Sequence, residues 1–82
     1  MKLYRIRWRD GLWHVLCGEE SIVASEDRDQ LIQVARKVVA RHDGELYVCN
    51  KGGKLEAMYT YTGQIESIRL FQKKGLRVPR DS

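Results

Sequence analysis

The chain lacks several features that mark large protein classes. It contains no run of 18 apolar residues, so the sequence predicts no membrane-spanning helix and no membrane partner. Its first residues lack the apolar core of a signal peptide, and we therefore expect a cytoplasmic protein. It also contains no low-complexity tract and no long internal repeat. These absences favour an ordinary globular protein.

Cysteine and histidine are scarce, with only Cys17, Cys49, His14 and His42 in the chain. In a cytoplasmic protein the two cysteines are expected to be reduced, small buried hydrophobic residues rather than a disulfide. The four residues lack the paired spacing of a zinc site, which needs about four ligands. We therefore predict no metal and no cofactor.

The motifs of common enzyme chemistry are also missing. There is no nucleophile elbow, no phosphate-binding glycine loop and no zinc-protease helix motif. Glu19 and Glu20 are adjacent in a polar turn, where solvation is expected rather than acid–base work. His14 and Cys17 are three residues apart on an expected strand, so they point to opposite faces. The sequence predicts a protein that is not an enzyme, with no small-molecule substrate.

The 82 residues are enough for one small domain, and we assign residues 1–75 to it and residues 76–82 to a flexible basic tail. Lysine and arginine number 15 against 11 acidic residues, which gives a net charge of +4. The charge is uneven, because basic segments 1–17 and 64–82 flank an acidic segment, 18–30. Such polarity suits self-association or an orienting partner as well as it suits nucleic acid.

Alternation of apolar and polar residues predicts strands near the start of the chain. Tyr4, Ile6 and Trp8 share one parity, which is the period of a strand over residues 2–8. Asp10-Gly11 then predicts a tight hairpin turn into a second strand over 12–17. Residues 22–24 can add a short third strand.

A helix is expected over residues 27–43. Ser25 or Asp27 can cap its first turn. Its apolar face is formed by Leu31, Val34, Ala35 and Val38, which recur at helical spacing. Gly44 is the expected stop.

Residues 45–49 and 54–61 predict a second hairpin, with the turn at Asn50–Gly53. Residues 64–74 do not alternate, and the spacing of their apolar residues predicts a short C-terminal helix. The expected fold class is therefore α+β, with an antiparallel sheet of two β-hairpins packed on one amphipathic helix. The expected order is β-β-α-β-β, followed by the short helix.

Residues 4–63 resemble a small bacterial family catalogued as domain of unknown function 2188. The resemblance depends on Asp10-Gly11-Leu12-Trp13 in the first turn, on the capped helix over residues 25–39 and on the second hairpin over residues 44–55. The chain departs from the family at Gly52-Gly53, where the family usually has Asp before Gly. The resemblance implies hairpin, helix and hairpin, and it implies no catalytic residue.

Two kinds of binding surface are candidates. Arginines at every second position of the first strand project from one face and can follow phosphates, with tryptophans nearby to stack on bases. The same alternation is also typical of the solvated face of a strand. The candidate nucleic-acid residues are Lys2, Arg5, Arg7 and Arg9, with Lys73, Lys74, Arg77 and Arg80 in the tail.

A protein interface is the other candidate, and self-association through an aromatic sheet face is our leading expectation. One helix covers only one face of a sheet, so aromatic side chains on the other face would form an interface. The alternatives are that these residues fill the core or that the C-terminal helix covers them. The candidate residues are Trp8, Trp13, Tyr47, Met58, Tyr59 and Tyr61.

Overall fold

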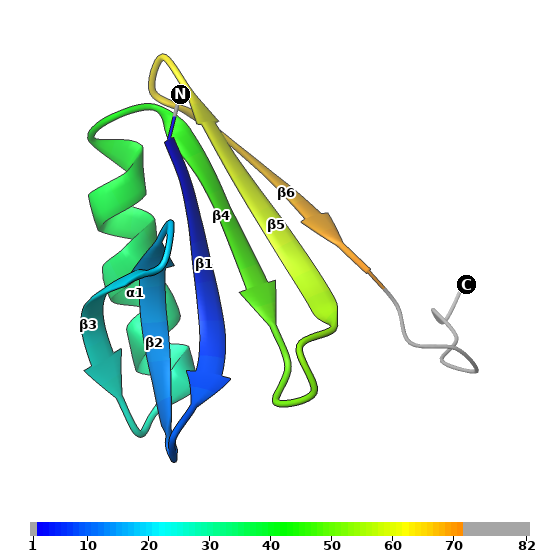
Figure 1. Ribbon diagram of the computed structural model, residues 1–82. Helices are drawn as coiled ribbons and strands as arrows, with labels where there is room; N and C mark the ends of the chain where they lie inside the picture. Colours follow the sequence, from blue (N-terminus) through cyan, green and yellow to red (C-terminus); the bar gives the residue numbers. More distant parts are fainter. Residues whose placement is uncertain (1, 72–82) are drawn as a thin grey trace, which may run out of the picture.

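A computed structural model describes residues 2–71 and shows one six-stranded sheet with a single helix on one of its faces (Figure 1). Among these residues no helix is long and apolar enough to cross a membrane. The elements in chain order are β1 (Lys2–Arg9), β2 (Leu12–Cys17), β3 (Glu20–Ser25), α1 (Arg28–Ala40), β4 (Gly44–Cys49), β5 (Leu55–Thr62) and β6 (Ile65–Leu70).

The sheet is mixed, with the strand order β3-β2-β1-β4-β5-β6. Strands β1 and β4 are parallel, and every other neighbouring pair is antiparallel. The parallel pair is possible because α1 carries the chain from β3 across one face of the sheet to β4. The predicted antiparallel sheet of two β-hairpins is therefore wrong, because the helix crossover joins the two halves in parallel and each half contains a third strand.

The predicted C-terminal helix over residues 64–74 is also wrong where the structure describes it. Residues Ile65–Leu70 form strand β6, which pairs with β5 along its whole length. The chain turns at Gly63 and Gln64, both with positive φ, as a two-residue hairpin requires. Both faces of β6 are exposed, so its sequence lacks the alternation of apolar and polar residues by which a strand is predicted. Residues 72–74 and the predicted tail over 76–82 lie outside the described residues.

The helix begins close to the predicted point and ends earlier. Asp27 is the N-cap, and its side chain accepts a hydrogen bond from the Gln30 N–H. The helix ends at Ala40, and Asp43, with a φ of 51°, turns the chain. Gly44 does not stop the helix but begins β4, where a Cβ atom would lie 2.6 Å from the Lys2 carbonyl oxygen. Glycine is needed there because β1 and β4 approach closely.

The core lies between α1 and the sheet face that it covers. Even-numbered residues of β1, such as Tyr4 and Ile6, pack there with Leu46 of β4. From the helix come Leu31, Ala35 and Val39, whereas Val34 of the predicted apolar stripe is largely exposed. Figure 1 shows α1 behind the β3–β4 side of the sheet, with β5 and β6 extending beyond it. The other face, here called the open face, is not covered by the helix.

Candidate arginine-rich sheet face

The arginines of β1 lie on the open face. Alternation along the strand places Tyr4 and Ile6 in the core and Arg5, Arg7 and Arg9 on the opposite side, all three exposed. Arg5, Arg7 and Arg9, here called the arginine ladder, therefore project from one face of β1, as predicted. Lys2 does not belong to it, because its even position places it on the same side of the strand as Tyr4.

The pairing register extends this face across the sheet. Arg5 lies opposite Leu16 on β2 and Tyr47 on β4, and Tyr47 in turn lies opposite Met58 on β5. Met58 lies opposite Arg69 on β6. One row of side chains thus crosses five strands, with Arg5 and Arg69 on either side of the Tyr47–Met58 pair. At about 4.8 Å per strand, the strands of the two arginines are about 14 Å apart.

The second row is set by Arg7 and the polar group beside it. Arg7 lies opposite His14. The His14 Nε2–H donates to the Arg9 carbonyl oxygen at 3.2 Å. Because the other nitrogen of a neutral imidazole is an acceptor, Nδ1 accepts from the Ser21 hydroxyl at 2.7 Å. The Arg7 guanidinium reaches over the turn between β4 and β5, where a Cβ atom on Gly53 would lie 3.0 Å from it. Hydrogen bonds therefore hold the His14 ring in one orientation on the open face, although it stays accessible to solvent.

Electrostatics distinguish this face from the rest of the described chain. Within residues 2–71 the ion pairs are Arg28–Glu56 and Arg36–Glu66, and neither involves an arginine of the open face. Glu45, beside Tyr47 on β4, accepts a hydrogen bond from the Tyr47 hydroxyl at 3.3 Å. Arg5, Arg7, Arg9 and Arg69 thus have no carboxylate partner in the described part of the chain.

The Cys49 thiol is affected by the positive charge of the open face. Its side chain is buried, and burial raises the pKa of the thiol, while the positive charges of Arg7 and Arg5 act in the opposite direction. Cys17 lies on the helix side of β2, so the two free thiols are on opposite faces of the sheet. His14 is on the open face, and the predicted separation of His14 from Cys17 is confirmed.

The aromatic residues predicted to form one interface are divided between the two faces. Tyr47 and Met58 are half-buried on the open face. The other four, Trp8, Trp13, Tyr59 and Tyr61, lie on the helix side, where Trp13 and Tyr61 are buried. The six candidate interface residues therefore do not share one face, because side chains alternate along each strand and the pairing register decides which positions of neighbouring strands lie on the same side.

The two tryptophans instead form a stack with basic side chains at one end of the helix side. Trp8 and Trp13 meet edge to face at 5.2 Å between ring centroids. The Arg28 guanidinium lies 5.1 Å from the Trp13 ring, and the Lys51 ammonium lies 4.3 Å from the Trp8 ring. Such cation–π contacts hold the β4–β5 turn and the start of α1 against β1 and β2.

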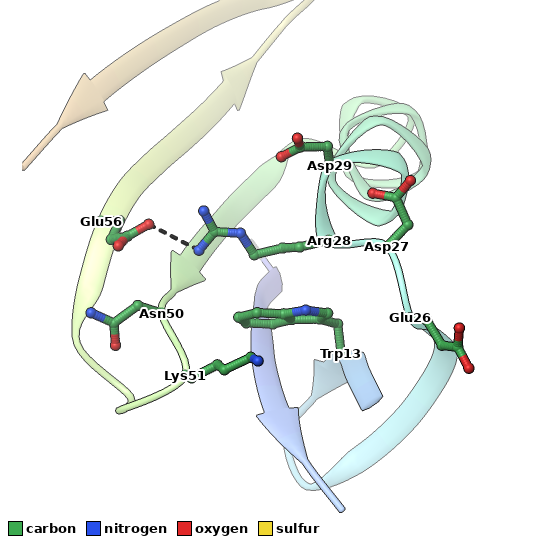
Figure 2. Close-up of a pocket in the computed structure, with 8 residues that line it drawn as sticks. All are labelled: Trp13, Glu26, Asp27, Arg28, Asp29, Asn50, Lys51 and Glu56. Carbon is green, nitrogen blue, oxygen red and sulfur yellow. Dashed lines mark hydrogen bonds and ion pairs between the residues drawn. The ribbon is translucent and has the colours of Figure 1, made fainter. Parts of the chain in front are cut away.

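A shallow depression of about 710 Å³ lies at this end, beside the N-terminus of α1. Figure 2 shows Arg28 above the Trp13 ring and directed toward Glu56, with Asn50 and Lys51 on the neighbouring turn. Arg28 also donates to the Cys49 carbonyl at 3.1 Å, and Asp27 is occupied as the helix cap. Arg28, Glu56 and Asp27 on the lining of the depression are thus already engaged in contacts within the fold.

Sequence reasoning missed Arg69, and it could not place the basic tail. Arg69 was assigned to a helix, so its position beside Met58 had no signal in the sequence. The predicted tail residues Lys73, Lys74, Arg77 and Arg80 lie outside the described residues. Within the described part of the chain, no three metal-ligating side chains converge.

Comparisons with protein-family models, with curated proteins and with solved structures gave no match to this chain. The resemblance of residues 4–63 to domain of unknown function 2188 therefore stays a prediction.

Proposed function

We propose that this protein is a non-catalytic binding module whose open face binds single-stranded nucleic acid. The observation that carries the proposal is the group of four exposed arginines, Arg5, Arg7, Arg9 and Arg69, on one sheet face without a carboxylate partner among the described residues. Guanidinium groups bind phosphate through paired hydrogen bonds, and an arginine that the fold does not use is available for that role.

The spacing of the arginines suits contacts with successive phosphates of a nucleic-acid strand. Successive arginines on β1 are two residues apart, which is about 6.7 Å along a strand. This distance is comparable to the separation of neighbouring phosphates in an extended single strand. Arg69 adds a positive charge across the sheet, so a bound strand would meet guanidinium groups on both sides of Tyr47 and Met58.

The shape of the face favours a single strand over a duplex. Six strands at about 4.8 Å spacing span about 24 Å, whereas the major groove of B-DNA is only about 12 Å wide. The sheet face therefore does not enter the groove as a unit. The half-buried Tyr47 ring lies between the arginines of β1 and Arg69, and the His14 ring lies beside Arg7 on β2; unpaired bases stack on such rings.

The test is a titration of a labelled single-stranded oligonucleotide pool of mixed sequence, followed by fluorescence anisotropy over a salt series. Four phosphate contacts predict a slope of about −2.8 for log affinity against log salt, at about 0.7 per contact. The double variant Arg5→Ala/Arg7→Ala is expected to reduce the slope by about 1.4. The control, Lys37→Ala/Arg41→Ala, removes the same charge from exposed positions on and beside α1 and should reduce it little.

Three results would contradict the proposal. The first is a wild-type protein that does not bind the pool at low salt. The second is equal loss of affinity in the two double variants, which would indicate attraction by net charge alone. The third is binding of an acidic peptide but not of the oligonucleotides, which would make the open face a protein-binding surface.

A further inference from the structure

We infer that strand β6 is the contact surface for a second copy of this chain, with the two β6 strands paired antiparallel about a two-fold axis at Ile68. The inference goes beyond the proposed function, because it concerns the edge of the sheet and not its open face. In the dimer, two six-stranded sheets would join edge to edge into one.

Among residues 2–71, no strand pairs with the outer edge of β6. The Phe71 N–H donates to the Glu56 carbonyl at 2.9 Å, so odd-numbered residues of this segment bond to β5. In an antiparallel ladder the bonding direction alternates along the strand. The backbone groups of Glu66, Ile68 and Leu70 therefore point away from β5, toward the open edge, where a further strand can pair with them.

The side chains of this edge are apolar and exposed. Ile65, Ile68, Leu70 and Phe71 are 68%, 50%, 71% and 38% exposed. β6 contains no proline, no lysine and no bulge, and of its two charged residues Glu66 is paired with Arg36 while Arg69 lies on the open face. The opposite edge differs, because β3 has a bulge against β2 and begins with Glu20, which follows Glu19.

Pairing two β6 strands about Ile68 places apolar opposite apolar and polar opposite polar side chains, except that Leu70 lies opposite Glu66 of the second copy. With Ile68 on the axis, Ile65 lies opposite Phe71 of the second copy, and Ser67 lies opposite Arg69 of the second copy. This register pairs odd positions with odd and even with even, so each face of one sheet continues into the same face of the other. Ile68 meets its own copy on the helix side, with Leu70 diagonal to it.

The area is sufficient for a specific dimer. Covering the four apolar side chains and the strand backbone in both copies removes on the order of 1,000 Å² from solvent, which is the lower limit for a stable interface. The axis also places the two Arg69 side chains near each other on the joined open faces. The dimer would thus present two arginine-rich faces as one surface.

The test is sedimentation velocity over a concentration series, without nucleic acid, at low and high salt. We expect a dimer that resists salt, because main-chain hydrogen bonds and apolar contacts are little screened. Ile68→Lys places two ammonium groups at the axis and should raise the dimer dissociation constant at least tenfold. Ile22→Lys is the matched control, since Ile22 is half exposed on the other edge and should leave the dimer intact. Circular dichroism checks that both variants are folded.

Cross-linking tests the register itself. Residues 68 of the two copies form a hydrogen-bonded pair with Cα atoms about 5.5 Å apart, which is within disulfide range. Ile68→Cys should therefore form a disulfide dimer under mild oxidation, while Leu70→Cys should not, because Glu66 lies opposite it. Wild-type protein, with Cys17 and Cys49, provides the background.

Several results would overturn the inference. A wild-type chain that stays monomeric over the whole series excludes the dimer. Persistence of the dimer in Ile68→Lys, or its loss in Ile22→Lys, assigns the interface to another surface. Faster cross-linking of Leu70→Cys than of Ile68→Cys excludes the register. Because none of these measurements uses nucleic acid, they stand apart from any failure of the arginine-rich face to bind it.

Discussion

Arginines on the two faces of the sheet differ in what surrounds them. On the helix side, Arg28 and Arg36 each form an ion pair, with Glu56 and Glu66, and each stacks on an aromatic ring. On the open face, Arg5, Arg7, Arg9 and Arg69 have neither kind of partner among the described residues.

The difference separates cations that the fold uses from cations that remain available. Arg36 shows the first kind, because it donates to both Glu66 and Tyr61 and so ties the β5–β6 hairpin to α1. Paired and stacked side chains have lost the freedom to meet a ligand. Arginines on the solvated face that have no such partner in the described part of the chain retain it, and we therefore expect substitutions on the two faces to affect different properties.

The largest expected effect is on stability, from the helix side. Leu46 is fully buried on β4 beneath α1. Leu46→Ala should lower the free energy of unfolding by about 2–5 kcal/mol, because it leaves a cavity in the core. Met58→Ala on the open face should cost less than about 1 kcal/mol. Urea denaturation of the two variants measures the contrast, and equal losses would mean that both faces are packed alike.

The next effect is on binding, from the open face. Tyr47→Leu retains apolar bulk but removes the ring, and it should weaken oligonucleotide binding by about 1–3 kcal/mol. Tyr59→Leu makes the same change on the helix side, where the ring lies 4.9 Å from the Arg36 guanidinium. It should reduce stability and leave oligonucleotide affinity unchanged. Anisotropy titrations at one salt concentration distinguish the two, and a reversed order would contradict the assignment of faces.

Arginine substitutions give a smaller and more direct contrast. Arg36→Ala removes the ion pair with Glu66 and the stacking on Tyr59, and it should cost about 1 kcal/mol of stability. Arg69→Ala removes an arginine that has no ion pair within residues 2–71, and it should change stability by less than about 0.5 kcal/mol. Thermal unfolding followed by circular dichroism measures both variants. A loss in Arg69→Ala as large as that in Arg36→Ala would show that the fold also depends on the open-face cation.

The last contrast concerns how stability changes with pH, and Tyr61→Phe tests it. Burial, with the hydrogen bond to Glu66, raises the pKa of Tyr61 to about 12, so its stabilisation is present below pH 10 and is lost as pH rises toward 12. The hydrogen bond from Tyr61, with those from Arg36, lowers the pKa of Glu66, so that contribution is lost as pH falls below about 4.5.

Removing the Tyr61 hydroxyl should weaken both dependences. Urea denaturation at a series of pH values should therefore show a flatter stability profile for Tyr61→Phe than for the wild-type protein at both ends. Tyr47→Phe is the matched control on the open face, and its profile should follow that of the wild type. An unchanged profile in Tyr61→Phe would mean that the Tyr61–Glu66–Arg36 cluster does not couple protonation to folding.

The sequence by itself determined the local elements whose pattern is strong. Alternation in β1 and β2 and the Asp10-Gly11 turn predicted the first hairpin, and the turn has positive φ at both residues, as expected. The cap at Asp27 and the apolar periodicity predicted α1, although the helix is shorter than expected. The arginine ladder followed from the same alternation, because side-chain direction along a strand needs no tertiary information.

Only the tertiary structure decided how these elements join. The parallel pairing of β1 with β4 depends on the crossover of α1 and on the close approach at Gly44, neither of which has a periodic signature. β6 was mistaken for a helix because an edge strand exposed on both faces carries no burial pattern. For the same reason Arg69 joined the open face unpredicted: which residues share a surface across strands is set by register, and register is a property of the folded sheet.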